Sequence, residues 1–347
     1  MKYGSTRPAI CGRTGHLLVL AERVALRLWL KGPTVELVRG GAVARVDLEG
    51  TAMNPGKSEL AALTRMFSAA VIRELGRSGR SALFARLLAQ SGLGPHLPLD
   101  ATVGDVFNHA FRLLRSLGNR DEYVYRSAIT QKILLGQHNL RTASMLSEAR
   151  VGMCKADVVV LNGTSTAYEI KSERDSLARL TNQVTSYGEV FAAVNVVTSP
   201  SHVKQVFRQI PGWVGVLVLS EKFTLQVERP AVVNAARTNP LAVLDLMRVD
   251  EAHQVLRSLD IAPPHVPNTQ MRGALCDLYR PLDPTAVHTQ MVATLKITRS
   301  QGAASDFIKT VPMSLRTAML SVKMNGASEK RVLDATRLPV SAAFAWS

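Results

Sequence analysis

The sequence has few cysteines, and nothing in their spacing would pair them or bind a metal. Its three cysteines, Cys11, Cys154 and Cys276, are odd in number and far apart, and no CxxC motif occurs. Disulfide frameworks and zinc sites both need grouped cysteines, so we expect reduced thiols in a cytoplasmic protein. A P-loop, a Rossmann glycine run and internal repeats are also absent, so nothing indicates those nucleotide-binding or repeat folds.

A long uninterrupted apolar run is lacking as well. The best candidate, residues 17–30, contains Glu22, Arg23 and Arg27, and no small-residue cleavage site follows it cleanly. Charged side chains are unfavourable in a bilayer, so this run is better interpreted as a core helix or strand than as a signal or anchor. We therefore expect no membrane association.

Acidic residues are scarce relative to basic ones. The 42 Lys and Arg residues outnumber the 27 Asp and Glu residues, which gives a net charge of +15. This balance favours a partner with dense negative charge, most simply nucleic acid, although some basic proteins have no such partner. With 347 residues, 46% of them hydrophobic, the chain can bury a sizeable core in two or more domains.

Hydrophobic patterning divides the chain into three regions. Residues 1–120 predict an accessory region, with a β-hairpin at 34–48 and helices at 57–75, 81–90 and 102–117. Residues 121–230 alternate helices and strands, with a long helix directly after Lys171, and this alternation predicts an α/β sheet covered on both faces. Residues 231–347 predict a helical region that ends in a basic, loosely ordered tail from Lys323.

One charged hairpin stands out in the second region. Residues 158–161 form a β-branched run, Asn162-Gly163 indicates a turn, and residues 167–171 resume the extended pattern. Asp157, Glu169 and Lys171 interrupt these strands. A charge in a buried strand is unfavourable unless it is paired or binds a ligand, so these three charges need a reason.

Strand geometry supplies one. Glu169 and Lys171 are two residues apart and therefore share a strand face. Asp157 joins that face only if paired positions sum to an even number, which excludes a two-residue turn centred on Asn162-Gly163 and favours a three-residue or other odd-length loop. Two converging carboxylates make a hard-oxygen site for Mg²⁺ or Mn²⁺, and an adjacent ammonium can hold or polarise a water.

The order Asp157, eleven intervening residues, then Glu169-Ile170-Lys171 resembles the signature of the PD-(D/E)XK nuclease superfamily. The resemblance implies a three-layer α/β/α, restriction-endonuclease-like core with a mixed sheet. It also implies that Asp157 and Glu169 bind the metal together with the backbone carbonyl of Ile170, and that Lys171 assists the attacking water.

The flanking positions agree with the superfamily in part. Ala156 stands where a proline often precedes the aspartate. Residues 168–177 and 210–216 resemble an uncharacterised bacterial branch of the superfamily. Lys155 shares a strand face with Asp157 and could contact a phosphate, although solvated strand-end lysines are common. Glu148, on the preceding strand, is either an edge charge or a residue that approaches the site.

Three further candidates come from the resemblance. In many of these nucleases a glutamate on the helix before the hairpin reaches the metal site, and Glu122 is the matching position; it equally suits a surface pair with Arg126, four residues on. Gln183 and Tyr187 form a Gln-x-x-x-Tyr pattern similar to that of nucleases related to the RecB helicase-nuclease, where these residues help to position substrate. The alternative for this pair is a half-buried tyrosine over a solvated glutamine.

These features predict a cytoplasmic, Mg²⁺-dependent nuclease that hydrolyses phosphodiester bonds, most simply in DNA. By analogy with the superfamily, its setting would be phage defence, a prophage or repair. Two alternatives stay open. One is a nucleic-acid-binding protein on the same fold with little catalysis, and the other is a structural ion cluster on a protein whose basic surface serves protein partners. A homodimer is also compatible with the sequence.

Overall fold

The computed structural model describes residues 34–39, 42–47, 55–116 and 118–346. The chain forms two compact units, Met1–Asn54 and Pro55–Ser347. In the first unit, β1 (Thr34–Arg39) and β2 (Ala42–Asp47) pair in antiparallel fashion, as the alternating pattern at residues 34–48 predicts. The apolar run at residues 17–30 lies outside the described residues.

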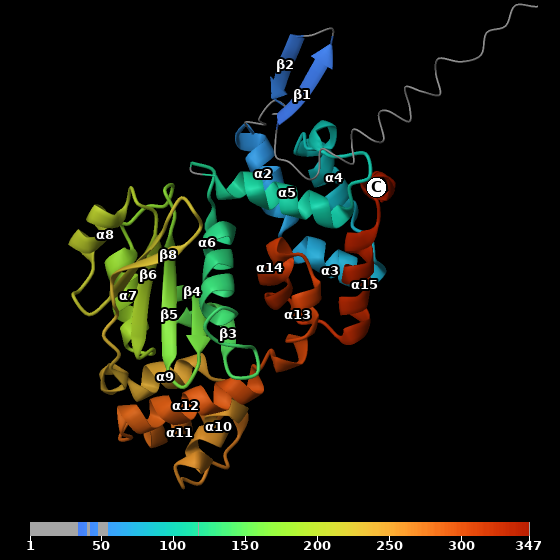
Figure 1. Ribbon diagram of the computed structural model, residues 1–347. Helices are drawn as coiled ribbons and strands as arrows, with labels where there is room; N and C mark the ends of the chain where they lie inside the picture. The colour runs from blue at the N-terminus through green and yellow to red at the C-terminus, as the bar shows by residue number, and fades with distance from the viewer. Residues whose placement is uncertain (1–33, 40–41, 48–54, 117, 347) are drawn as a thin grey trace, which may run out of the picture. The chain divides into compact units, whose positions relative to one another are not determined.

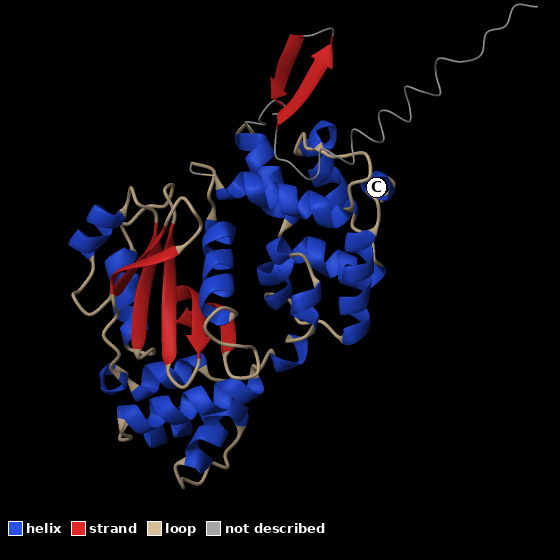
Figure 2. Ribbon diagram, viewed as in Figure 1, coloured by secondary structure: helices blue, strands red, loops and turns tan. Residues whose placement is uncertain are grey.

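A six-stranded mixed sheet forms the centre of the second unit (Figures 1 and 2). Its strands lie in chain order: β3 (Ser144–Val151), β4 (Cys154–Leu161), β5 (Ser165–Lys171), β6 (Ala193–Thr198), β7 (Gly215–Leu219) and β8 (Leu225–Arg229). β3, β4 and β5 are antiparallel, β5, β6 and β7 are parallel, and β8 is antiparallel to β7. The predicted α/β class with a mixed sheet is confirmed.

Helices cover both faces of this sheet. The helices in contact with it are α6 (Glu122–Ile129, continued by a π-helical turn at Thr130–Leu134), α7 (Leu180–Gly188), α8 (Val203–Gln209), α9 (Pro240–Leu246) and α12 (Pro284–Thr298). Val159 and Leu161 of β4 belong to the hydrophobic cluster that contains α7, α9 and α12. Val158 and Val160 alternate with them and are buried on the other face. α6 lies beside β5 on that second face (Figure 1).

The remaining helices form two groups. Before the sheet lie α2 (Lys57–Met66), α3 (Ala69–Ser78), α4 (Ala82–Gln90), the 3₁₀ turn Gly94–His96 and α5 (Val103–Arg115). After it lie α10 (Val249–Ser258), α11 (Asn268–Tyr279), α13 (Phe307–Thr310), α14 (Arg316–Leu320), α15 (Gly326–Arg337), α16 (Val340–Phe344) and the 3₁₀ turns Ala235–Arg237, Gly302–Ala304 and Met313–Leu315. None of the helices described here is long and apolar enough to cross a membrane.

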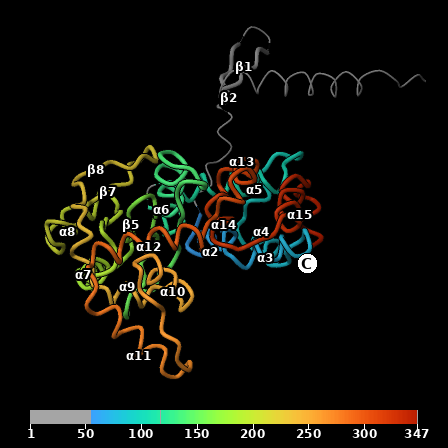
Figure 3. Tube along the Cα trace, turned by 90° about the horizontal axis from the view of Figure 1, so that it is seen from below, coloured from blue at the N-terminus to red at the C-terminus, as the bar shows by residue number. Residues whose placement is uncertain are grey.

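The C-terminal helices fold back onto the helices that precede the sheet. α15 lies beside α3 and α5, and α16 lies beside α4 (Figures 1 and 3). A bridge between Thr102 and Pro339 joins the two groups. The expectation of a loosely ordered tail from Lys323 is therefore wrong, because this segment forms helices with a packed face.

Two helix predictions also need correction. The helix expected at residues 57–75 is two helices, because the hydroxyl of Ser68 caps the second one. The helix expected directly after β5 begins only at Leu180. Asp175 Oδ2 accepts hydrogen bonds from the N–H and the hydroxyl of Ser172, at 2.8 and 2.6 Å. These local bonds close a turn where the helix was expected.

Candidate metal and nucleic-acid site

The β4–β5 hairpin has the register that the charge argument requires. Its loop comprises three residues, 162–164, and its ladder runs back to Val158 opposite Tyr168. The next positions in that register are Asp157 and Glu169. The two carboxylates therefore lie at the same level of neighbouring strands.

The two strands separate at this level. The β4–β5 ladder ends at Val158 and Tyr168, although both strands continue. The next N–H that would reach across, that of Ile170, donates instead to Asp157 Oδ2 at 2.7 Å. The N–H and C=O of a strand residue point to the same side, so the carbonyl of Ile170 also faces this opening. The side chain of Asp157 thus takes the place of a backbone acceptor.

Glu169 is buried and is held from two sides. Its residue surface is 1% exposed. Its Oε1 accepts from Lys171 Nζ at 2.7 Å and its Oε2 accepts from the Tyr187 hydroxyl at 2.8 Å. That hydroxyl also lies 2.7 Å from the carbonyl oxygen of Lys155. Burial and then the charge of Glu169 raise the pKa of Tyr187 far above its usual range, so the hydroxyl keeps its proton and donates.

Asp157 carries an unfavourable charge in this position. Burial is the largest cause that raises its pKa well above the usual range, and the charges of Glu169 and Glu122 raise it further. The hydrogen bond from Ile170 N–H and the charge of Lys171 act in the opposite direction. A divalent cation between Asp157 and Glu169 would relieve their mutual repulsion.

Glu122 lies at the border of the site. In the first turn of α6 it forms an ion pair with Arg126, which is the surface pair that its spacing predicted. Its charge also acts on Asp157. The segment before α6 is bound to the loop after β5, because Arg174 donates to the carbonyl of Gly118 at 2.5 Å. The start of α6 is thereby held near the end of β5.

Gln183 lies one turn before Tyr187 on α7. Its side-chain oxygen Oε1 is buried and has no hydrogen-bond partner among the described residues. A buried amide oxygen without a donor is unfavourable, and polar groups of this kind are uncommon in folded proteins. Gln183 Oε1 is therefore a buried acceptor that the described residues leave unsatisfied.

Glu148 lies on the opposite side of Asp157. The β3–β4 register on either side of it places Glu148 across from Asp157. Its φ of 52° is in the left-handed region, which residues other than glycine seldom adopt. Its carboxylate binds Lys155 Nζ at 2.9 Å. Glu148 thus lies next to Asp157 in the sheet, and its exposed carboxylate is paired with Lys155.

The donor set fits a hard divalent cation. Asp157, Glu169 and the carbonyl of Ile170 supply oxygen ligands, which Mg²⁺ and Mn²⁺ prefer. Within the part of the chain that the structure describes, no group of three or more His, Cys, Asp or Glu side chains could share a metal ion. The carbonyl of Ile170 would supply a third protein donor beside the two carboxylates.

Comparison with known proteins places the chain in a family. The model of the family described as bacteriophage P4 protein cII matches residues 116–317, more than half of the chain and all of the site residues. The chain belongs to the bacteriophage P4 protein cII family. Protein cII of Enterobacteria phage P4 is 36% identical over 63 residues, which cover 18% of this chain and 24% of the phage protein. The aligned part thus spans about a quarter of that family member, and no solved structure matches the chain.

Proposed function

We propose that this protein is a nuclease that depends on Mg²⁺ or Mn²⁺ and hydrolyses phosphodiester bonds in DNA. One observation carries the proposal: Asp157 and Glu169 lie at the same level where β4 and β5 separate, and the backbone of Ile170 faces the same opening. The net charge of +15 suits a polyanionic substrate. Among the settings that the superfamily analogy implies, phage defence, a prophage or repair, the match to a phage protein favours a phage-related one.

The contacts of each side chain define its task. A divalent ion held by Asp157, Glu169 and the carbonyl of Ile170 would polarise the phosphate and lower the pKa of a bound water. Lys171 is held on Glu169 and supplies a positive charge close to where negative charge grows on the phosphate. Tyr187 fixes the other oxygen of Glu169, so this carboxylate is oriented before substrate arrives.

Two residues act at the margin of the site. Gln183 has an amide oxygen with no partner among the described residues, one helical turn before Tyr187, and a donor on the substrate or a water would satisfy it if the side chain turned toward the site. Glu122 acts on Asp157 through its charge. Among the described residues its side chain bonds Arg126 and forms no hydrogen bond with the proposed metal ligands. We therefore assign substrate placement to Gln183 and an electrostatic role to Glu122.

A second candidate function is nucleic-acid binding without cleavage. The observation that favours it is that both oxygens of Glu169 already accept hydrogen bonds, from Lys171 and from Tyr187. Such a cluster is neutralised and hydrogen-bonded without a metal ion. In that case the basic surface would bind nucleic acid and the acidic pair would serve the fold.

A cleavage assay separates the two candidates. End-labelled single-stranded DNA, double-stranded DNA and RNA would be incubated with the full chain in EDTA, in Mg²⁺ and in Mn²⁺. The variants would be Asp157→Asn, Glu169→Gln, Lys171→Met and Gln183→Ala. The matched control is Glu189→Gln, purified in the same way, because Glu189 is exposed at the end of the same helix as Tyr187.

The nuclease proposal expects cleavage by the wild type and by Glu189→Gln only when a divalent metal is present. Asp157→Asn, Glu169→Gln and Lys171→Met should lose cleavage, and Gln183→Ala should be slower. Binding measured by gel shift at one salt concentration should survive in all variants, because affinity comes mainly from phosphate contacts. Cleavage by Glu169→Gln at the wild-type rate would refute the proposal. Nucleic-acid binding by the wild type without any cleavage would support the second candidate.

A further inference from the structure

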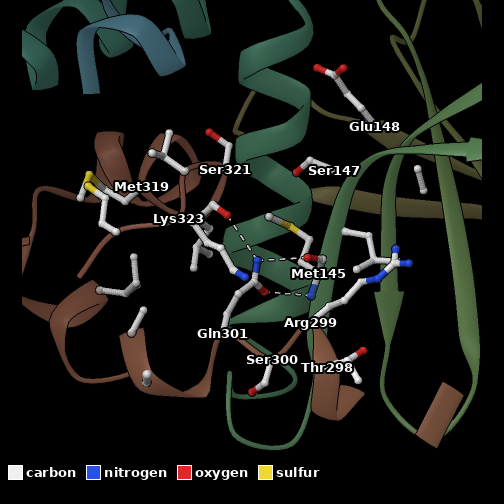
Figure 4. Close-up of a pocket in the computed structure, with 18 of the residues that line it drawn as sticks. Met145, Ser147, Glu148, Thr298, Arg299, Ser300, Gln301, Met319, Ser321 and Lys323 are labelled. Atoms are coloured by element: carbon white, nitrogen blue, oxygen red, sulfur yellow. Dashed lines mark hydrogen bonds between the residues drawn. The ribbon is translucent and has the colours of Figure 1, made fainter. Parts of the chain in front are cut away.

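A cavity of about 630 Å³ lies along the free edge of β3 (Figure 4). Its wall comes from four parts of the chain that are distant in sequence: residues 145–150, 245–248, 298–308 and 319–329. Glu148 belongs to this wall and also lies across from Asp157 in the sheet. The cavity therefore borders the proposed cleavage site.

The charges on this wall leave a positive excess. Three of the charged wall residues have partners: Glu148 pairs with Lys155, Asp245 with Arg272, and Arg299 with Glu251. Arg150, Arg248 and Lys323 are exposed and have no ion-pair partner within the described part of the chain. Against these three cations stands one remaining acid, Glu329. The unbalanced charge would attract an anion.

The interior combines an aromatic ring with a polar strand edge. Phe307 is the one aromatic side chain among the lining residues, and it is half-buried. Gln301 occupies the first part of the edge: it accepts from Met145 N–H at 2.9 Å and donates to Met145 C=O at 3.0 Å (Figure 4). Ser147 is two residues further along β3, so its backbone N–H and C=O point toward the same edge.

We propose that this cavity binds one nucleotide of a single nucleic-acid strand. Arg150, Arg248 and Lys323 contact the phosphates, and the base stacks on Phe307. Ligand cavities of roughly 300–1,000 Å³ hold one drug-sized molecule, which matches a nucleotide and leaves no room for two paired strands. Stacking on an aromatic ring tolerates any base and is typical of single-strand binding. The inference rests on the proposed function, because the bound strand is the one that continues past Asp157.

Binding is tested without cleavage. Fluorescence anisotropy of a labelled 12-nucleotide single-stranded DNA would be measured with the full chain in EDTA, over a series of salt concentrations. The pocket variant replaces Arg150, Arg248 and Lys323 by Ala. The control replaces Arg77, Lys204 and Arg257 by Ala; these cations are exposed, lie outside the cavity wall and lower the net charge equally. Phe307→Leu keeps an apolar side chain and removes the stacking surface.

The pocket variant should bind the single strand at least tenfold more weakly than the control variant at the same salt. The loss of three phosphate contacts should also reduce the slope of log K against log salt by about 2, since each contact on a single strand contributes about 0.7. Phe307→Leu should weaken binding roughly five- to tenfold and leave the salt slope unchanged, because stacking is not an ionic contact. Unlabelled single strand should compete better than a duplex of equal length, and a mononucleotide should compete more weakly than the strand.

The proposal is overturned if the pocket and control variants weaken binding equally, if Phe307→Leu binds as the wild type does, or if the duplex competes as well as the single strand. A mononucleotide that competes as well as the strand would overturn the strand assignment. These outcomes are separate from those of the nuclease proposal. Binding in EDTA that depends on the pocket, with no cleavage in any metal, would refute the nuclease proposal alone. Cleavage by the wild type, with wild-type binding by both the pocket variant and Phe307→Leu, would refute the cavity proposal alone.

Discussion

Breaking the ion pair between Lys171 and Glu169 should destabilise the second unit strongly. The two charged atoms are 2.7 Å apart, and the side chains are 9% and 2% exposed. Removal of one partner of a buried pair leaves an uncompensated charge, which costs about 3–5 kcal/mol. Lys171→Met and Glu169→Gln should therefore each lower the free energy of unfolding by about that amount.

The double substitution should recover most of this loss. With both charges removed, neither member of the pair is left without its partner, and the hydroxyl of Tyr187 can still donate to the amide oxygen at position 169. Replacement of a buried pair by uncharged groups of similar volume is often close to neutral, so we expect a net cost below about 1.5 kcal/mol. The matched control is the exposed pair of Lys155 and Glu148, whose side chains are 60% and 57% exposed. Lys155→Met should cost less than about 1 kcal/mol.

Urea unfolding followed by tryptophan fluorescence measures these differences. Trp213 and Trp346 both lie in the second unit and report on its unfolding. The burial argument is refuted if Lys171→Met costs no more than Lys155→Met. It is also refuted if the double variant loses as much stability as the two single variants combined, because independent additive losses would mean that the two groups do not interact.

Three other predictions use the same unfolding assay. Mg²⁺ at about 100 times its dissociation constant should raise the free energy of unfolding of the wild type by about 2.7 kcal/mol and leave Asp157→Asn unchanged; equal shifts would contradict the metal site. Arg120 is buried and donates to four backbone carbonyls, so Arg120→Met should cost roughly 3–5 kcal/mol. Exposed Arg73→Met should change stability by less than about 0.5 kcal/mol, and a similar effect at both positions would count against the role of Arg120. Burial lowers the pKa of His288 from 6.5 to about 4, so the unfolded chain takes up a proton first and about 3 kcal/mol of stability should be lost as the pH falls from 6.5 to 4. His288→Asn should flatten this part of the pH profile, and an unchanged profile would refute the assignment.

The charged hairpin could be predicted because its signals are local. Side chains alternate between the two faces of a strand, so Asp157 and Glu169 can share a face only if the numbers of paired residues add up to an even number. The observed pairing, with its three-residue loop, meets this condition. β8 (Leu225–Arg229) was missed although Leu225 and Val227 alternate with polar residues, because this edge strand is only five residues long and its side chains lie mostly outside the core. The turn at Ser172 was missed because side-chain bonds from Asp175 compete with helix formation, and the helical spacing of apolar residues does not report on them.

The cavity could not be predicted, because its parts meet only in the folded chain. Met145 and Gln301 are 156 residues apart, yet the side-chain amide of one matches the backbone edge of the other. Arg150, Arg248 and Lys323 lie in three separate segments, and nothing in the spacing of basic residues along the chain marks them as neighbours. The strong positive charge of the sequence indicates an anionic partner, but tertiary packing decides where that partner would bind.

Asp157 has two tasks at the point where β4 and β5 separate, and two substitutions can distinguish them. Its carboxylate replaces the backbone acceptor that Ile170 N–H would otherwise lack, and it is also the proposed metal ligand. Asp157→Asn keeps an acceptor oxygen for Ile170 and removes the charge, so it should lose cleavage and Mg²⁺-dependent stabilisation while unfolding in metal-free buffer at nearly the wild-type urea concentration. Asp157→Ala also leaves the N–H of Ile170 without its partner, which should cost a further 1–3 kcal/mol or so. If Asp157→Asn unfolded as easily as Asp157→Ala, the charge itself would be holding the strand end. The separation of the strands would then be a consequence of the ion cluster, and the acidic pair would no longer support a metal site.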